Sequence, residues 1–189
     1  LKVEVNRVQI DRTRNTGAMW LANMKTQNSS SFAEQISKSP SQPVRPLLEL
    51  VKWMFGKSVH TFIGIMTCIT ESLGVKPGSE HHNYLQSERD KIIEEFRELL
   101  KDDNSVFLYP THPIVAPYHN EPLIRVFNFT YTSLINLLGF PSCNIPLGLG
   151  KSEGLPLGIQ CAANYNNDRL CLAVASELEK AFGGWVAFS

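Results

Sequence analysis

The sequence has no excess of charge of either sign, because 18 lysines and arginines balance 18 aspartates and glutamates. A domain that binds nucleic acid usually carries a basic patch, and this chain has no surplus of positive charge from which to build one. A hydrophobic content of 43% in 189 residues is typical of a packed domain and differs from that of a disordered chain. We therefore expect a folded protein with no nucleic-acid partner.

The spacing of metal ligands is absent as well. The cysteines form no Cys-x-x-Cys pair, and no histidine cluster lies beside them to complete a zinc site. We interpret them as buried apolar thiols in a protein of a reducing compartment, and we expect neither a metal nor a cofactor. The four are Cys68, Cys143, Cys161 and Cys171.

A long uncharged hydrophobic run is also missing. A membrane-spanning helix needs about 20 nearly uncharged residues, whereas the most apolar stretch, residues 47–70, is interrupted by Glu49, Lys52, Lys57 and His60. Two interpretations stay open for this stretch. It forms two core helices, or it forms an apolar cap that touches a membrane and admits a lipid, since Trp and Phe interspersed with Lys suit an interfacial helix. The aromatic side chains that would contact the lipid are Trp53, Phe55 and Phe62.

The remaining pattern alternates strands with helices, which predicts an α/β protein with a mixed β-sheet flanked by α-helices. Three prolines within residues 37–46 predict a flexible loop, the best candidate for an internal boundary. We expect a helix after Ser79, which can cap its start, and another that ends at Gly139. Expected helices cover residues 16–24, 46–55, 59–70, 79–101, 123–138 and a last one from about 167, and expected strands cover 2–10, 105–109, 142–147 and 156–162.

Several motifs near the end of the chain occur in a specific order. They are Phe127-Asn128 at a helix start, Gly139-Phe140-Pro141 at a turn, Pro146-Leu147-Gly148 at a strand end, and GLPLGIQ over residues 154–160. In this order the motifs resemble the amidase signature family of serine amidohydrolases, and within it the members that hydrolyse fatty-acid amides. The resemblance is strongest over residues 105–186. It implies that residues 1–189 are the carboxy-terminal part of an amidase domain, with a partial amidase-signature fold.

The strand motif also has a physical interpretation of its own. Gly154 and Gly158 are expected to let backbones approach closely around a central strand. Gln160 places an amide among apolar neighbours, where it must find hydrogen-bond partners. These residues describe a scaffold and not a reacting group.

The resemblance implies amide hydrolysis by a Ser–Ser–Lys triad, in which a lysine acts through a bridging serine to deprotonate the nucleophilic serine. Backbone N–H groups of a Gly- and Ser-rich loop would hold the oxyanion. This chain has no such loop, because its one serine cluster, residues 29–31, lies between Asn28 and Phe32 and not between glycines. The chain also begins at Leu1 and not at a methionine. We therefore expect the triad to lie upstream, in an amino-terminal half that is the partner of this chain, and the chain alone to be inactive.

By the same resemblance, Val126, Phe129 and Ser133 match positions that line an acyl-chain channel, and their spacing places them on one helix face. Plain core packing is the alternative for all three. The expected function is the carboxy-terminal portion of a hydrolase of fatty-acid amides, membrane-associated and intracellular by resemblance. Two alternatives stay open. One is another amidase, or an amidotransferase subunit, of the same family, and the other is a non-catalytic module that binds lipid or another protein.

Two further features are interpreted as structural or unused. His112 and His119 lie in a proline-rich loop without an acid or a nucleophile beside them, so we expect them to make structural hydrogen bonds. The acceptor pattern for N-glycosylation at Asn128 lies in an apolar helix that is expected to be buried, which argues against its modification.

Overall fold

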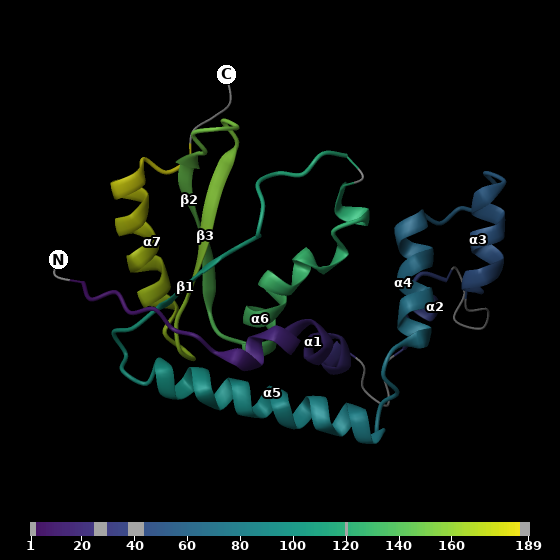
Figure 1. Cartoon of the computed structure of the whole chain (residues 1–189), viewed down its shortest axis with the longest axis horizontal. Helices are drawn as coiled ribbons and strands as arrows, with labels where there is room; N and C mark the ends of the chain where they lie inside the picture. Colours follow the sequence, from purple (N-terminus) through teal and green to yellow (C-terminus); the bar gives the residue numbers. More distant parts are fainter. Residues whose placement is uncertain (1–2, 25–29, 38–43, 120, 186–189) are drawn as a thin grey trace. The chain divides into compact units, whose positions relative to one another are not determined.

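The computed structural model describes residues 3–24, 30–37, 44–119 and 121–185 (Figure 1). The chain divides into two compact units, residues 1–20 with 86–189, and residues 21–85, and each is described by itself. The helices are α1 (Thr16–Met24), α2 (Phe32–Gln35), α3 (Pro46–Met54), α4 (Phe62–Leu73), α5 (Glu80–Leu99), α6 (Thr130–Leu138) and α7 (Asp168–Phe182). The strands are β1 (Phe107–Pro110), β2 (Ser142–Leu149) and β3 (Pro156–Ala162), and the 3-10 helices are η1 (Asp11–Asn15), η2 (Glu121–Leu123) and η3 (Val126–Phe129).

The larger unit is built on a sheet with the strand order β1-β3-β2, so that β3 is central. Both pairings of β3 are antiparallel. In this register Gln160 of β3 lies opposite Tyr109 on one side and Asn144 on the other. The expected α/β class is confirmed, and the strand expected over residues 156–162 has these bounds.

Helices cover both faces of this sheet. Figure 1 shows α7 on one side of β2 and β3 and α6 on the other. Successive side chains of a strand point to opposite faces, so Cys161 packs with Cys171 of α7 while Gln160 bonds to the start of α6. The apolar cluster under α7 is centred on Ile145, Cys161, Ala163 and Cys171.

Helix α5 confirms the clearest helical pattern of the sequence. The Ser79 hydroxyl accepts a hydrogen bond from the backbone N–H of His82 at 3.2 Å and so caps the helix. In the larger unit, Arg12 of η1 is bonded to Glu88 and to Glu95, which lie two turns apart on α5. This contact fixes η1 against the helix. The buried stripe of α5 consists of Leu85, Ile92, Phe96 and, just beyond its end, Leu100.

The end of α6 is also as predicted. Gly139 adopts a left-handed conformation with φ of 69°, and its N–H bonds to the Ile135 carbonyl at 3.0 Å. A glycine adopts this conformation without the steric cost that a Cβ atom brings. Pro141, two residues later, lies outside the helix, as expected for a residue that cannot continue it.

In the smaller unit, two apolar helices follow the expected order. Pro46 is the first residue of α3, and the Thr61 hydroxyl caps α4 by accepting from the Gly64 N–H at 3.2 Å. Because Thr61 is the cap, α4 begins at Phe62 and not at residue 59. The Phe32 N–H at the start of α2 donates to the Glu71 carboxylate of α4 at 2.8 Å.

Three expectations are corrected. The strand expected over residues 2–10 is wrong for the described residues 3–10, which are irregular, because its alternating valines find no neighbouring strand there and stay exposed. The helix expected over residues 123–138 is interrupted, since Arg125 has non-helical backbone angles and regular α-helix begins only at Thr130. Most of the proline-rich loop, residues 38–43, lies outside the described residues.

The two motif glycines have different roles. A Cβ atom on Gly158 would lie 3.1 Å from the Asn144 side-chain oxygen, so the expected close approach is confirmed there. At Gly154 no atom lies within 4 Å of that position, and the expectation of close approach is wrong. Gly154 instead has a φ of +65°, which the turn between β2 and β3 requires.

Candidate functional site

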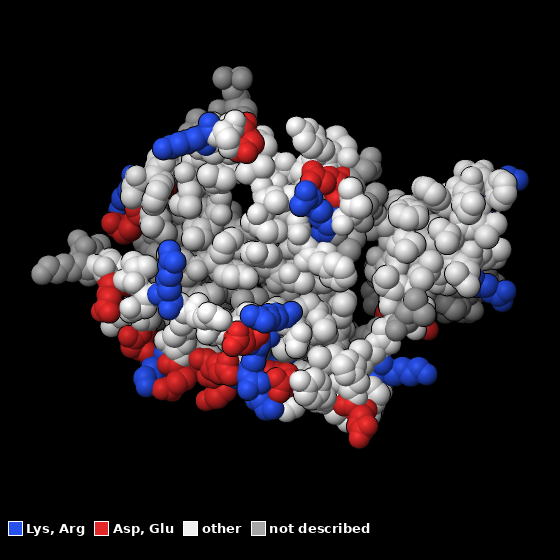
Figure 2. All heavy atoms as spheres, viewed as in Figure 1, with Lys and Arg blue, Asp and Glu red and all other residues white. Residues whose placement is uncertain are grey.

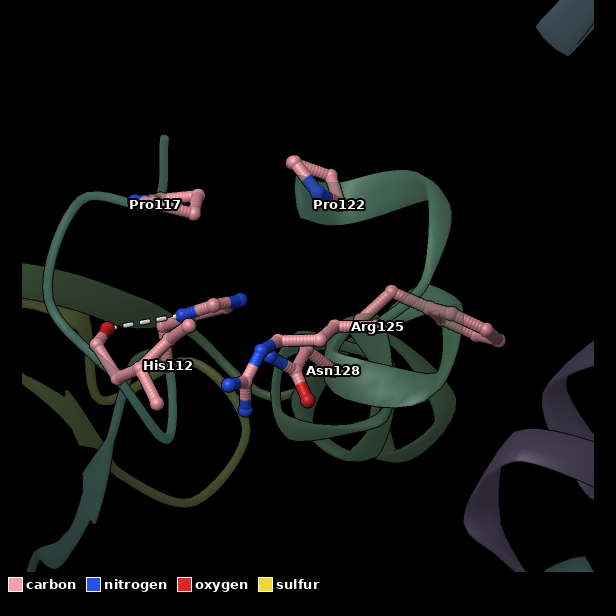
Figure 3. A pocket seen from close by; sticks show the side chains of 7 residues that line it. His112, Pro117, Pro122, Arg125 and Asn128 are labelled. Atoms are coloured by element: carbon pink, nitrogen blue, oxygen red, sulfur yellow. Dashed lines mark hydrogen bonds between the residues drawn. The ribbon is translucent and has the colours of Figure 1, made fainter. Parts of the chain in front are cut away.

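A cavity of about 250 Å³ lies in the larger unit, between the loop that follows β1 and the segment that leads into α6 (Figure 3). It is somewhat smaller than the roughly 300–1,000 Å³ that hold a drug-sized ligand, so it fits one end of a long molecule. The lining residues are His112, Ile114 and Pro117 from the loop, and Pro122, Arg125, Asn128 and Phe129 from the segment before α6.

The orientation of His112 is fixed by its own loop. Its Nδ1 lies 2.9 Å from the Ile114 carbonyl oxygen. A carbonyl oxygen only accepts hydrogen bonds, so Nδ1 carries the proton of the bond. The expected structural hydrogen bond is thus confirmed for His112. Its other ring nitrogen, Nε2, is directed toward the cavity (Figure 3).

Arg125 brings a positive charge to the cavity. Its Nε donates to Glu121 at 2.7 Å, and the other Glu121 oxygen accepts from the Tyr118 N–H at 3.0 Å. This pairing uses only one side of the guanidinium group. The two terminal amino groups have no hydrogen-bond partner among the described residues, and they lie on the cavity side in Figure 3.

Asn128 contributes a buried donor to the same cavity. Its side-chain nitrogen is buried and has no hydrogen-bond partner among the described residues. Leaving a buried donor unpaired costs about 1–3 kcal/mol, so the position is one where a ligand oxygen would be stabilising. Because this nitrogen is also the atom that glycosylation would modify, its burial argues against use of the pattern at Asn128.

Gln160 holds the two walls of the cavity together. Its side-chain nitrogen donates to the Pro110 carbonyl at the end of β1 and to the Tyr131 carbonyl in the first turn of α6, both at 3.1 Å. The loop with His112 begins directly after Pro110, and the segment with Arg125 ends directly before Thr130. The amide expected to need buried partners therefore has them, and its bonds set the distance between the two walls.

The residues expected to line an acyl channel fall in different environments. Phe129 lines the cavity and packs against Trp20 with ring centroids 5.3 Å apart. Ser133 is buried in α6, and its hydroxyl donates to the Thr130 carbonyl at 2.9 Å. The side chain of Val126 lies outside the part of the chain that the structure describes. Contact of these residues with an acyl chain stays a prediction.

The three aromatic residues expected to contact lipid lie in the smaller unit. Trp53 and Phe62 stack with ring centroids 4.9 Å apart, which joins α3 to α4. Phe55, just after α3, is 71% exposed, and Met54 beside it is equally exposed. Figure 2 shows few charged side chains over this unit on the face drawn. No described helix is both long enough and apolar enough to cross a membrane.

The cysteines of the larger unit are packed around the sheet and α7, away from the cavity walls. Cys143 and Cys161 face each other across β2 and β3, and Cys171 lies in the same apolar cluster. Burial raises the pKa of Cys161 to about 12 and raises the pKa values of Cys143 and Cys171 as well. Thiols that hold their protons this strongly are poor nucleophiles. All four cysteines are free, and among the described residues no group of three or more His, Cys, Asp or Glu side chains could hold a metal ion.

Sequence reasoning did not single out Arg125 or the amide of Asn128 as polar groups of a site. The spacing of Glu121 and Arg125, four residues apart, was the signal that could have indicated a fixed guanidinium. The cavity lining contains no serine, cysteine or lysine. The cavity can therefore bind and orient a ligand, but its lining offers no nucleophile.

Comparison with known proteins gives consistent results. A family model described as amidase matches residues 2–172. The chain is 39% identical to human fatty-acid amide hydrolase 2, covering 98% of the chain and 35% of that protein, and 44% identical to fatty-acid amide hydrolase 2-B of Danio rerio, covering 82% and 28%. It thus spans about a third of the length of these relatives. The crystal structure of a glutamyl-tRNA(Gln) amidotransferase subunit from Thermotoga maritima has a similar fold, with a TM-score of 0.56 and 22% identity over 92% of this chain and 34% of that one.

Proposed function

The chain belongs to the amidase family, and on that premise we propose that it is the carboxy-terminal, substrate-binding part of a serine amidohydrolase that converts fatty-acid amides to fatty acid and amine. The observation that carries the proposal is the 39% identity to human fatty-acid amide hydrolase 2 along 98% of the chain. The cavity beside α6 supports it, since its lining combines apolar side chains with a few fixed polar groups, as ligand sites do.

In this proposal the work is divided between two parts of a longer protein. A Ser–Ser–Lys triad outside residues 1–189 attacks the amide, forms an acyl-enzyme and is regenerated by water. Residues of this chain bind and orient the acyl part, with Val126, Phe129 and Ser133 as contacts. The third of their length over which the relatives are matched is compatible with this division.

We further propose that α3, α4 and the turn between them form an apolar cap that contacts a membrane surface. Trp53 and Phe62 join the two helices, and the exposed Phe55 would insert into the boundary between head groups and acyl chains. A cap of this kind would give a lipid amide a path that avoids water. It would make the longer protein membrane-associated and, by analogy with its relatives, intracellular.

Labelling with a fluorophosphonate probe, which reacts with activated serines, tests the division of work. We expect labelling of a longer protein in which an amino-terminal half with a Gly- and Ser-rich loop precedes this sequence, and none of the 189-residue chain. Labelling of the chain by itself would show that one of its own serines is the nucleophile. Absence of labelling in both would remove the proposed amidohydrolase function.

An amidotransferase subunit of the same family is the second candidate, and the fold shared with the Thermotoga maritima subunit favours it. Turnover of a long-chain amide and of a short-chain amide by the longer protein separates the two. We expect the long chain to be preferred, because each additional buried CH₂ group contributes about 0.8 kcal/mol. A preference for the short amide would favour the second candidate. A third candidate, a non-catalytic module that binds lipid, predicts binding of both without turnover.

A further inference from the structure

We propose that the cavity beside α6 is a binding site for a carboxylate attached to an apolar chain, with Arg125 and Asn128 as its donors. The proposal rests on the proposed function in so far as the ligand is a lipid, and it adds the chemistry of the group that the cavity selects. The two sources of such a group are a free fatty acid and an acyl chain linked to an amino acid.

The polar groups of the cavity have open positions that match a carboxylate. Arg125 is fixed by Glu121 through Nε alone, so the planar pair of terminal amino groups stays available, and that pair has the geometry of a bidentate carboxylate contact. The buried nitrogen of Asn128 is a further donor without a partner among the described residues. A carboxylate offers two oxygen atoms with about four lone pairs, enough for both residues.

The electrostatic balance also favours one negative charge and not more. Glu121 carries a negative charge, but the Arg125 Nε and the Tyr118 N–H already occupy its oxygens. His112 is held by Ile114 through Nδ1, so its Nε2 either accepts a proton from a carboxylic acid or, once protonated, donates to a carboxylate. Both forms place one shared proton between the imidazole and the ligand.

The apolar part of the lining accounts for the rest of the ligand. Ile114, Pro117, Pro122 and Phe129 surround the polar groups. A volume of about 250 Å³ holds a head group and the first part of a chain, and not a complete long acyl chain. The site therefore recognises the end of the molecule, and a small anion such as acetate would lack the apolar contacts.

The test is isothermal titration calorimetry of the 189-residue chain with three probes of similar length, decanoate, N-decanoylglycine and the uncharged decanamide. We expect both anions to bind at least about 10-fold more tightly than decanamide, the factor typical of one charge-assisted hydrogen bond. Tighter binding of decanoate would identify the free acid as the source, and tighter binding of N-decanoylglycine would identify the acyl amino acid. Equal binding of decanamide and the anions, or no binding of either anion, would overturn the proposal.

Variants make the test specific to the cavity. Arg125→Met should weaken binding of the preferred anion about 10-fold or more and leave decanamide within about 3-fold. Arg169→Met, which removes an exposed arginine of α7, is the matched control and should change neither. Asn128→Asp keeps the shape of the side chain but adds a negative charge, and it should abolish anion binding while decanamide still binds. Decanamide binding also reports that each variant is folded.

The outcome is separable from that of the proposed function. If the longer protein hydrolyses fatty-acid amides but the anions bind no better than decanamide, the proposed function stands and the carboxylate site is wrong. If Arg125-dependent anion binding occurs in a protein that hydrolyses no amide, the site stands and the amidohydrolase proposal fails.

Discussion

The side-chain nitrogen of Gln160 lies 3.1 Å from the carbonyl oxygen of Pro110. The same nitrogen, at the same distance, donates to Tyr131. One amide of the central strand thus binds the end of an edge strand and the beginning of a helix, on a face of the sheet that is closed to water.

We predict that Gln160→Met destabilises the protein by about 1–3 kcal/mol, because the change keeps the length of the side chain but removes both donors and leaves two carbonyl groups with unmade bonds. Urea unfolding followed by circular dichroism measures the change. Gln9→Met, at an exposed position, is the control and should stay within about 0.5 kcal/mol of the unchanged protein. Equal stability of the two variants would show that the Gln160 bonds contribute little.

The buried thiol of Cys161 predicts a fall in stability at alkaline pH. The unfolded thiol loses its proton near a pKa of about 8.5, whereas burial raises the pKa of the folded thiol to about 12. Below the lower value both states hold the proton. Above it the unfolded state holds fewer protons, so the free energy of unfolding falls by about 1.4 kcal/mol per pH unit for this thiol.

The measurement is urea unfolding at several pH values between 8 and 10.5. Cys161→Ala should lower stability at pH 8 by removing buried volume, but it should also reduce the slope against pH. Part of the slope is expected to remain, because burial also raises the pKa values of Cys143, Cys171 and Tyr109. A slope unaltered by the substitution would assign the alkaline loss of stability to groups other than Cys161.

The left-handed conformation at Gly139 predicts a cost for any residue with a Cβ atom. A Cβ there would meet only ordinary contact, 3.7 Å from the Tyr165 hydroxyl, so the cost is conformational. We expect Gly139→Ala to lower stability by about 1–2 kcal/mol and Gly139→Asn to lower it less, since Asn tolerates this conformation better. Melting temperatures of the two variants check the order, and the reverse order would contradict the conformational explanation.

The apolar turn after α3 predicts binding to lipid vesicles. Phe55→Ser should weaken sedimentation with phosphatidylcholine vesicles about 10-fold, because a fully buried Phe side chain contributes roughly 1.5–3 kcal/mol. Leu172→Ser, at a similarly exposed apolar position on α7, is the control and should have no effect. Equal loss in both variants would indicate general adsorption of apolar surface and not a specific cap.

Much of the fold could be predicted from local patterns. The cap at Ser79, the stripe of α5, the glycine end of α6 and the bounds of β3 depend on residues close together in the sequence, so they were predicted correctly. The strand expected over residues 2–10 failed because alternation indicates a face to be buried and does not supply a neighbour. The cavity failed for a related reason. Arg125, Asn128 and His112 acquire a joint meaning only when Gln160 brings their two segments together, and that contact joins residues 29 and 50 positions apart.

The register of the sheet has a consequence for variation in related chains. The row Tyr109, Gln160 and Asn144 faces α6, and the next row, with Cys161 and Cys143, faces α7. An irregularity between Pro146 and Leu149 lies just after these rows. A slip of one residue in β3 would exchange the two rows and press amides into the thiol cluster. Length changes in the turn before β3 should therefore be tolerated in descendants only when the pairing upstream of Pro146 is unshifted, which makes that irregularity the place where the hairpin can grow or shrink.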